Sequence, residues 1–180
     1  MKLKASIDLD DTILSFYRHF VDYFGKPKSD SEITKKVGGV LLKDKEFWLS
    51  QPLIDTPNFV PHCYCTARII PKKLIRKQIQ LNNLPNAPIY QVFGFGLSKY
   101  AQLRRANVDV HIDDSINNFI DLNSKGIPCL LIDRPHNQEW GPIGRIYSLD
   151  KNEIIDTYYL FKETMFDNFN LLINDPKKVG

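Results

Sequence analysis

The stretch Ile7-Asp8-Leu9-Asp10-Asp11-Thr12 ends a short apolar segment near the start of the chain. Alternate side chains of a strand point the same way, so Asp8 and Asp10 are expected to converge where this strand ends. Two carboxylates held that close repel each other unless a cation or a shared proton lies between them. A magnesium ion would supply the positive charge, because it prefers oxygen ligands. The plainer alternative is a polar turn after a strand, since aspartate is common in turns.

Further along the chain, a second strand-like segment ends in the same way. Val108-Asp109-Val110-His111-Ile112-Asp113-Asp114 runs from alternating apolar residues into a pair of carboxylates. Between the two acidic segments, Thr66 directly follows another predicted strand, and Lys99 lies at the start of a predicted helix. The chain therefore carries, in order, Asp-x-Asp, Thr, Lys and Asp-Asp, each beside the end or start of a predicted element. One such feature is weak, but the ordered set favours a common site over unrelated polar turns.

Short apolar segments alternate with helical patterns over most of the sequence. The predicted strands cover residues 3–7, 59–65, 89–93, 108–112 and 129–132. The predicted helices cover residues 71–82, 98–106, 116–124 and 151–172. This alternation is typical of βαβ units joined by right-handed crossovers. It predicts an α/β fold: a Rossmann-like three-layer α/β/α core with a central parallel sheet.

The connection between the first two predicted strands is too long for a simple crossover. It contains Phe16–Phe24 at helical spacing and further helical pieces up to Trp48. We expect a small helical cap, inserted after the first strand and lying above the carboxyl edge of the sheet, where open α/β sheets bind ligands. The predicted domains are a core of residues 1–15 and 59–180 and a cap of residues 16–58.

The composition, with 43% hydrophobic and 25% charged residues over 180 positions, is typical of a soluble globular protein. No apolar run approaches the ~18 residues needed to span a bilayer, so we expect no membrane partner. The three cysteines, Cys63, Cys65 and Cys129, form an odd and sparse set. Such a set is typical of a reducing compartment, and we expect no secretory signal before the first strand. These features predict a cytoplasmic protein and leave its oligomeric state open.

The ordered motifs resemble those of the haloacid dehalogenase superfamily of phosphatases, over residues 2–132. The resemblance implies that Asp8 is a nucleophile, which attacks phosphorus to give an aspartyl-phosphate. It implies that Asp10 protonates the leaving oxygen and then activates the water that cleaves the intermediate. It also implies a Mg²⁺ cofactor held by Asp8, Asp114 and the backbone carbonyl of Asp10, with Asp113 in a supporting position.

Two further residues take roles from the same resemblance. Thr66 and nearby N–H groups at a helix N-terminus would hold the phosphate oxygens. Lys99 would stabilise the transferring phosphoryl group with its positive charge. The alternative for Lys99 is a solvated lysine on a helix surface.

The cap region resembles the 5'(3')-deoxyribonucleotidase branch of this superfamily. Phe16 follows the first motif at the offset of a base-stacking aromatic residue, and Glu46-Phe47-Trp48 precedes Pro52 as an aromatic pair does in that branch. Residues 131–137 and 145–148 resemble the branch after the fifth strand. The resemblance implies a small phosphorylated substrate, a nucleoside monophosphate, whose base stacks on Phe16, Phe47 and Trp48. Alternatively, these three side chains form only the interior of the cap.

The sequence departs from that branch at two places. Thr66-Ala67-Arg68 stands where Thr-Ser-Pro is common, so one phosphate-binding hydroxyl is missing and a cation is added. Ala67 and Arg68 are nevertheless predicted to bind substrate. Asp11 stands where glycine is usual.

Two alternative functions are compatible with the same motifs. Arg68 and the basic helix after it suggest a polynucleotide 3'-phosphatase acting on DNA or RNA ends, although the net charge of +3 argues against a large nucleic-acid footprint. The second alternative is a non-catalytic phosphate-binding module. Such a module would normally lack Asp8 or Asp10.

Overall fold

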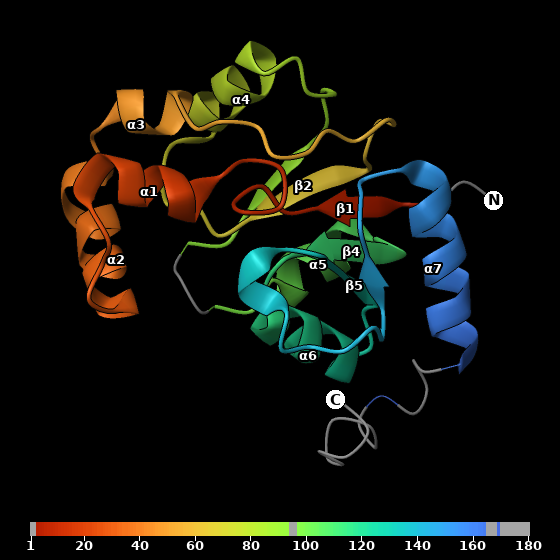
Figure 1. The fold of residues 1–180 in the computed structure, drawn as a ribbon. Helices are drawn as coiled ribbons and strands as arrows, with labels where there is room; N and C mark the ends of the chain where they lie inside the picture. Colours follow the sequence, from red (N-terminus) through yellow and green to blue (C-terminus); the bar gives the residue numbers. More distant parts are fainter. Residues whose placement is uncertain (1–2, 94–96, 165–168, 170–180) are drawn as a thin grey trace.

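A sheet of six parallel strands forms the centre of the protein in the computed structural model, which describes residues 3–93, 97–164 and 169 (Figure 1). The strands are β1 (Ala5–Ile7), β2 (Cys63–Thr66), β3 (Ile89–Gln91), β4 (Val110–Asp113), β5 (Cys129–Ile132) and β6 (Arg145–Ile146). Their order across the sheet is β3-β2-β1-β4-β5-β6. The predicted α/β fold with a central parallel sheet is confirmed.

Helices cover both faces of this sheet and complete the three layers. They are α4 (Lys72–Leu81), α5 (Tyr100–Ala106), α6 (Ile116–Ser124) and α7 (Lys151–Thr164). Figure 1 shows α4 on one side of the strands and α5 and α6 on the other, while α7 packs beside β5 and β6. None of the described helices is long and apolar enough to cross a membrane.

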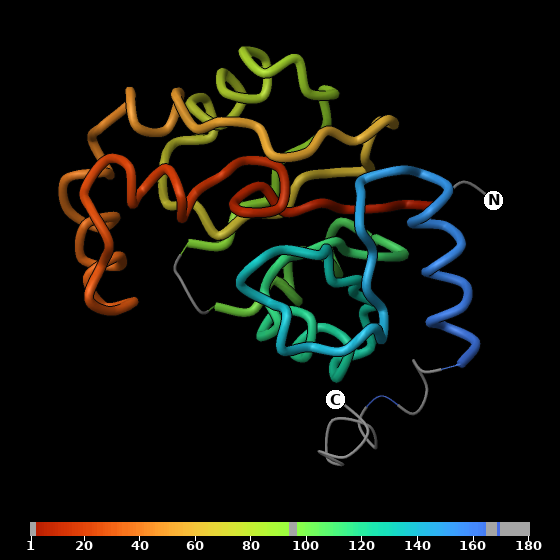
Figure 2. The backbone as a smooth tube through the Cα atoms, in the orientation of Figure 1, coloured from red at the N-terminus to blue at the C-terminus, as the bar shows by residue number. Residues whose placement is uncertain are grey.

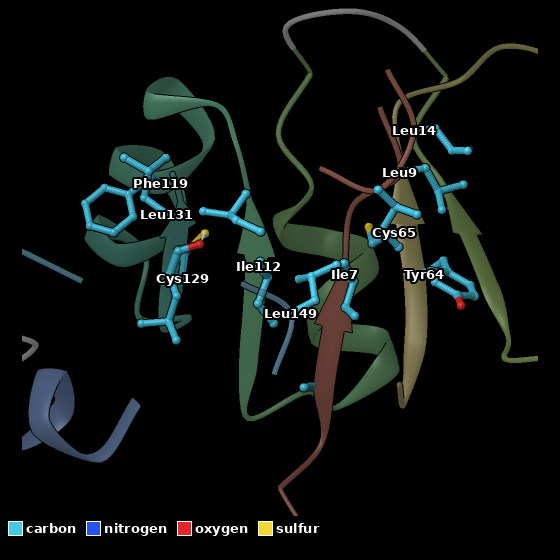
Figure 3. Close-up of a cluster of buried hydrophobic side chains, with 14 of the residues drawn as sticks. Ile7, Leu9, Leu14, Tyr64, Cys65, Ile112, Phe119, Cys129, Leu131 and Leu149 are labelled. Atoms are coloured by element: carbon cyan, nitrogen blue, oxygen red, sulfur yellow. Dashed lines mark hydrogen bonds between the residues drawn. The ribbon is translucent and has the colours of Figure 1, made fainter. Parts of the chain in front are cut away.

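The strand residues are buried because both faces of the sheet are covered. Every residue of β1, β2, β4 and β5 is buried. Figure 3 shows Ile7, Ile112 and Leu131 in this core, with Phe119 of α6 next to Leu131. All three cysteines are free and buried in β2 and β5, as small interior residues.

Several element boundaries differ by one or two residues from the sequence-based prediction, and three differences are larger or of another kind. The second strand begins at Cys63 and not at residue 59, because Pro61 lacks the N–H that a strand interior needs. The short strand β6 was missed, since two residues show no periodicity. The last helix was predicted to reach Leu172, but the described helix ends at Thr164, and Leu172 lies outside the described residues.

The long connection between β1 and β2 is helical, as predicted. It contains α1 (Phe16–Phe24), α2 (Asp30–Lys36), a π-helical turn η1 (Val37–Leu41) and α3 (Lys45–Leu49). This helical segment is the red-to-orange part of the tube in Figure 2, and α3 packs against α4. Its buried side chains belong to the same hydrophobic cluster as the sheet. The division into a core domain and a cap domain stays a prediction.

The strand order has a switch point at β1. The chain adds β2 and β3 on one side of β1 and then adds β4, β5 and a connection through η2 (Pro135–Asn137) to β6 on the other. Open sheets of this kind bind ligands in the crevice at the carboxyl ends of the two strands flanking the switch. Here these strands are β1 and β4, in which Ile7 pairs with Ile112.

Candidate active site

Three carboxylates meet at the carboxyl edge of β1 and β4. Asp8 follows β1, Asp113 ends β4, and Asp114 comes next. The backbone N–H of Asp8 donates to Ile112 at 3.0 Å, which extends the β1–β4 ladder and brings Asp8 alongside Asp113. One oxygen from each carboxylate lies within 4.8 Å of the others, and all three residues are buried. Asp8 of the first acidic motif therefore lies beside Asp113 and Asp114 of the second, and the Asp10 carboxylate is not part of this cluster.

Lys99 balances part of this negative charge. Its Nζ lies 2.9 Å from Oδ2 of Asp8 and 2.7 Å from Oδ2 of Asp113, and the residue is 1% exposed. Burial opposes the charged form, but Asp113 and Asp8 outweigh it and raise the pKa of Lys99 above its usual range. Lys99 is thus a buried cation between two carboxylates and not a solvated helix lysine.

Asp113 is fixed in place by surrounding donors. Oδ2 accepts from Lys99 and faces Nε2 of His111 at 3.0 Å, while Oδ1 accepts from the backbone N–H of Ser115 at 3.0 Å. The Asn118 amide lies 3.1 Å from both oxygens. Burial opposes ionisation, but Lys99 and His111 hold the pKa of Asp113 below its usual range. Asp113 is therefore an ionised carboxylate, and neighbouring donors in the protein occupy most of the acceptor sites on its oxygens.

Asp8 and Asp114 retain more capacity to bind a ligand. Within the described residues, the buried Oδ1 of Asp8 has no hydrogen-bond partner. Burial raises the pKa of Asp8, and Lys99 only partly opposes this. Oδ1 of Asp114 accepts from the hydroxyl of Thr12 at 2.9 Å, and Oδ2 faces Nε2 of His136 at 2.8 Å. An all-oxygen cluster with an unpartnered carboxylate oxygen suits a hard divalent cation such as Mg²⁺.

The acidic cluster opens into a cavity of about 580 Å³. Its walls include Asp10, Phe16 and Ala67 as well as the cluster and Lys99. A second cavity of about 760 Å³ shares Phe16 and Asp114 with the first and continues past α1 and α2. The site thus has room for a phosphoryl group at the carboxylates and for a larger group beside them.

Asp10 lies on the cavity wall, but its carboxylate is turned to Arg68. Nε of Arg68 is 2.9 Å from Oδ2 of Asp10, and Nη2 is 2.6 Å from Oδ1. The Arg68 side chain is fully buried in this pair. Arg68 was predicted to bind substrate; its guanidinium instead faces Asp10 and the protein interior.

Thr66 ends β2, and its hydroxyl is buried. It accepts from the backbone N–H of Arg68 at 3.4 Å. The helix after it, α4, begins only at Lys72. Thr66 therefore does not lie at a helix N-terminus, although the sequence analysis predicted that it would. The neighbouring Ala67 is the residue of this loop that lines the cavity.

Only one of the three predicted stacking aromatics lies on the cavity wall. Phe16 lines both cavities. Phe47 and Trp48 are 0% and 1% exposed and lie behind it, with the rings of Phe16 and Trp48 stacked at 5.9 Å. Phe47 and Trp48 therefore build the interior of the helical segment, which was the alternative interpretation.

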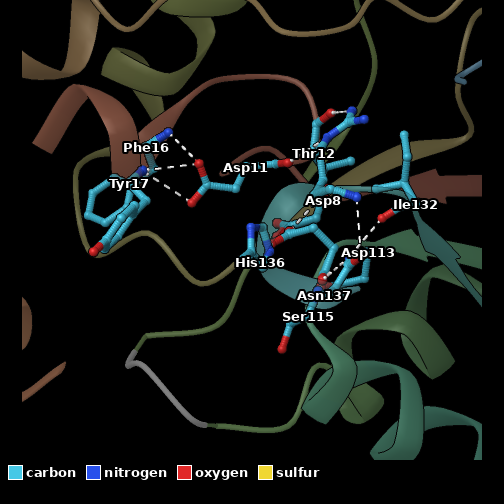
Figure 4. A network of polar contacts seen from close by, with 12 residues as sticks. Asp8, Asp11, Thr12, Phe16, Tyr17, Asp113, Ser115, Ile132, His136 and Asn137 are labelled. Carbon is cyan, nitrogen blue, oxygen red and sulfur yellow. Dashed lines mark hydrogen bonds and ion pairs between the residues drawn. The ribbon is translucent and has the colours of Figure 1, made fainter. Parts of the chain in front are cut away.

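Asp11 adopts a left-handed conformation, with φ of 53°, which explains why glycine suits this position. Its carboxylate accepts from the N–H groups of Phe16 at 2.9 Å and Tyr17 at 3.0 Å, where α1 begins (Figure 4). Burial, followed by the negative charge of Asp114, raises the pKa of Asp11 to about 7. Arg134 holds the same loop by donating to the carbonyl of Asp11 at 3.0 Å.

Several residues that orient the carboxylates were not identified from the sequence. Thr12 lies within the first motif, but nothing in the sequence assigned it a role. Asn118 is in the first turn of α6, a position from which it can reach back to Asp113. His136 lies far along the chain from Asp114, and no spacing pattern connects the two.

No protein-family model matches the chain, and no curated protein or solved structure matches it either. Function is therefore inferred from the residues of the site and their arrangement.

Proposed function

We propose that this protein is a magnesium-dependent phosphomonoester hydrolase of the haloacid dehalogenase type, which forms an aspartyl-phosphate at Asp8. One observation carries the proposal: Asp8, Asp113 and Asp114 converge at the sheet's switch point, with Lys99 bonded to two of them. Burying this many charged groups costs free energy of folding. Such clusters of buried ionisable groups are typical of functional sites.

The proposed reaction has two steps. An oxygen of Asp8 attacks phosphorus, and the bond to the leaving oxygen breaks with its electron pair on that oxygen, which takes a proton from the Asp10 carboxyl group. Water then attacks the phosphorus of the aspartyl-phosphate and gives a proton to the Asp10 carboxylate, while the P–O bond to Asp8 breaks. Lys99 orients Asp8 and stabilises charge on the phosphoryl group throughout.

The metal-binding part of the proposal rests on the oxygen-only donor set and on the unpartnered Oδ1 of Asp8. Asp8 and Asp114 would hold the ion, together with the Asp10 carbonyl that the family resemblance implies. When bound, Mg²⁺ supplies positive charge that offsets the repulsion between these carboxylates and a phosphate.

A nucleoside monophosphate is the substrate that the surroundings support best. The second cavity is lined by the aromatic rings of Phe16, Tyr17 and Trp140, which suit the face of a base. Asp30 and Glu139 also line it, and none of its lining residues is Lys or Arg. An acidic wall disfavours additional phosphates, and so supports a mononucleotide over a polynucleotide end. The burial of Arg68 weakens that alternative further.

A phosphate-release assay tests the proposal. p-Nitrophenyl phosphate, 5'- and 3'-mononucleotides and 3'-phosphorylated oligonucleotides are compared with magnesium, with EDTA and with calcium, beside Asp8→Asn as the inactive control. We expect hydrolysis with magnesium, none with EDTA, and poor recovery with calcium, whose larger and looser shell misplaces the nucleophile. Full activity after exhaustive chelation contradicts the proposal, and preference for oligonucleotides overturns its substrate class.

A further inference from the structure

Arg68 is a cation that contacts the wall of the first cavity through Asp10. Its side chain is fully buried, and it lies on the loop between β2 and α4. Its guanidinium donates to both carboxylate oxygens of Asp10, with Nε 2.9 Å from Oδ2 and Nη2 2.6 Å from Oδ1. A planar guanidinium can form such a bidentate pair with a carboxylate, through two parallel N–H···O hydrogen bonds. The ammonium group of a lysine cannot form this pair.

The guanidinium is itself held by several parts of the fold. Nη2 donates to Oε1 of Gln51 at 2.7 Å, and Nη1 donates to Oε1 of Gln78. Gln78 also donates to Gln51 at 2.8 Å, and the guanidinium carbon lies 5.3 Å from the centre of the Trp48 ring. The Arg68 carbonyl accepts from Gln91 at 3.0 Å. Arg68 therefore has one arrangement, fixed by α4, β3 and the end of the helical segment.

This arrangement leaves acceptor sites unused on the Asp10 carboxylate. A carboxylate has about two acceptor sites on each oxygen, and the fork uses one on each. The Asp10 side chain remains 23% exposed and lines the cavity next to Asp8. Arg68 thus fixes the position of the carboxylate, and the Asp10 side chain remains accessible from the cavity.

We infer that Arg68 is a positioning residue, which holds Asp10 in place for proton transfer to the leaving oxygen and does not bind substrate. The inference rests on the proposed function, in which Asp10 is the acid and base. It also connects the helical segment to the chemistry, because Gln51 and Trp48 from that segment contact the guanidinium.

The test compares two substrates of nearly the same shape, phenyl phosphate and p-nitrophenyl phosphate. Phenol is the more basic leaving group and needs the proton from Asp10, whereas p-nitrophenol leaves readily without it. The value of kcat/KM covers the steps up to departure of the leaving group, so it isolates this proton transfer. We expect Arg68→Gln to lower the ratio of kcat/KM for phenyl phosphate to that for p-nitrophenyl phosphate by at least ~10-fold.

A second Arg68 variant keeps the test decisive if Arg68→Gln does not fold, and a variant of Arg76 is the control. Arg68→Lys keeps the buried charge but cannot bridge both oxygens, so it should lower the same ratio to a smaller degree. Arg76→Gln, on the exposed face of α4, should leave both rates unchanged. Circular dichroism checks that each variant is folded.

A double mutant separates positioning from structure. In an Asp10→Asn background, Arg68→Gln should cause no further loss of kcat/KM on either substrate. Equal losses on both substrates for folded Arg68 variants, or an added loss in the Asp10→Asn background, overturn the inference while leaving the proposed function intact. A wild type that releases no phosphate from any monoester overturns the proposed function and the inference with it.

Discussion

The ammonium nitrogen of Lys99 lies 2.9 Å from Oδ2 of Asp8, with both side chains buried. Replacing Lys99 with Met leaves the neighbouring carboxylates without their cation. We expect a loss of about 3–5 kcal/mol in the free energy of unfolding, as for other buried pairs that lose one partner. Urea unfolding measures this.

The control for that variant is Lys125→Met. Lys125 makes an exposed pair with Asp121 at 2.6 Å, four residues earlier on the chain. Its loss should cost no more than ~1 kcal/mol, because water screens an exposed pair. Similar losses for the two variants would contradict a buried charge balance at Lys99.

The lowered pKa of Asp113 predicts how the free energy of unfolding depends on pH. Its pKa in the folded protein is lowered, since Lys99 and His111 outweigh the effect of burial. Its stabilising contribution is therefore complete above the unfolded value of ~3.9 and is lost as pH falls below it toward the folded pKa. Urea unfolding in EDTA should show a decline in stability below about pH 4 that is shallower in Asp113→Asn. Identical acid slopes for the two proteins would remove Asp113 as the cause.

Magnesium should stabilise the folded protein even without substrate. A ligand that binds only the folded state raises stability with its concentration, by about 2.7 kcal/mol at a hundred times its Kd. The melting temperature of the wild type should therefore rise with added Mg²⁺, and that of Asp114→Asn should rise much less. Asp121→Asn is the matched control, because Asp121 also lines this cavity but does not belong to the carboxylate cluster, and it should respond like the wild type. An equal response from all three proteins argues against a metal site at Asp114.

Substitutions of Tyr17 and Phe16 test the hypothesis that the second cavity binds the base of a nucleotide. Tyr17 is 44% exposed, so Tyr17→Ala should fold normally. Phe16→Leu keeps the apolar contact with Trp48 but removes the aromatic face. Each should weaken nucleoside monophosphate binding by ~1–3 kcal/mol and hardly affect p-nitrophenyl phosphate, which has no base to stack. Tyr159→Ala on α7, where the side chain is similarly exposed at 50%, should change the binding of neither substrate. Parallel losses on both substrates would mean that these rings only support the fold.

The parts of the site that follow from strand periodicity could be predicted. Asp8 and Asp113 each stand at the end of an apolar strand, and neighbouring parallel strands present these ends at one edge. Lys99 was found for a similar reason, because it opens the helix before β4.

The parts that depend on long-range side-chain contacts could not be predicted. The sequence around Arg68 does not determine whether its flexible side chain faces the cavity or reaches back to Asp10. An aromatic residue such as Trp48 suits a buried interior and a stacked base equally well. The packing of α3 against α4 buries Trp48. Gln78 of α4 and Gln51 after α3 both contact the Arg68 guanidinium.

The most direct test of the account is to locate the phosphoryl group during turnover. The protein is mixed with ³²P-labelled substrate and magnesium, quenched in acid, digested, and its labelled peptide identified by mass spectrometry. We predict a hydroxylamine-sensitive acyl phosphate on the peptide that contains Asp8. Asp8→Asn should fold, carry no label and turn over substrate too slowly to measure, because an amide is a poor nucleophile. Label on another residue, or an Asp8→Asn protein within ~10-fold of wild-type activity, would contradict the account.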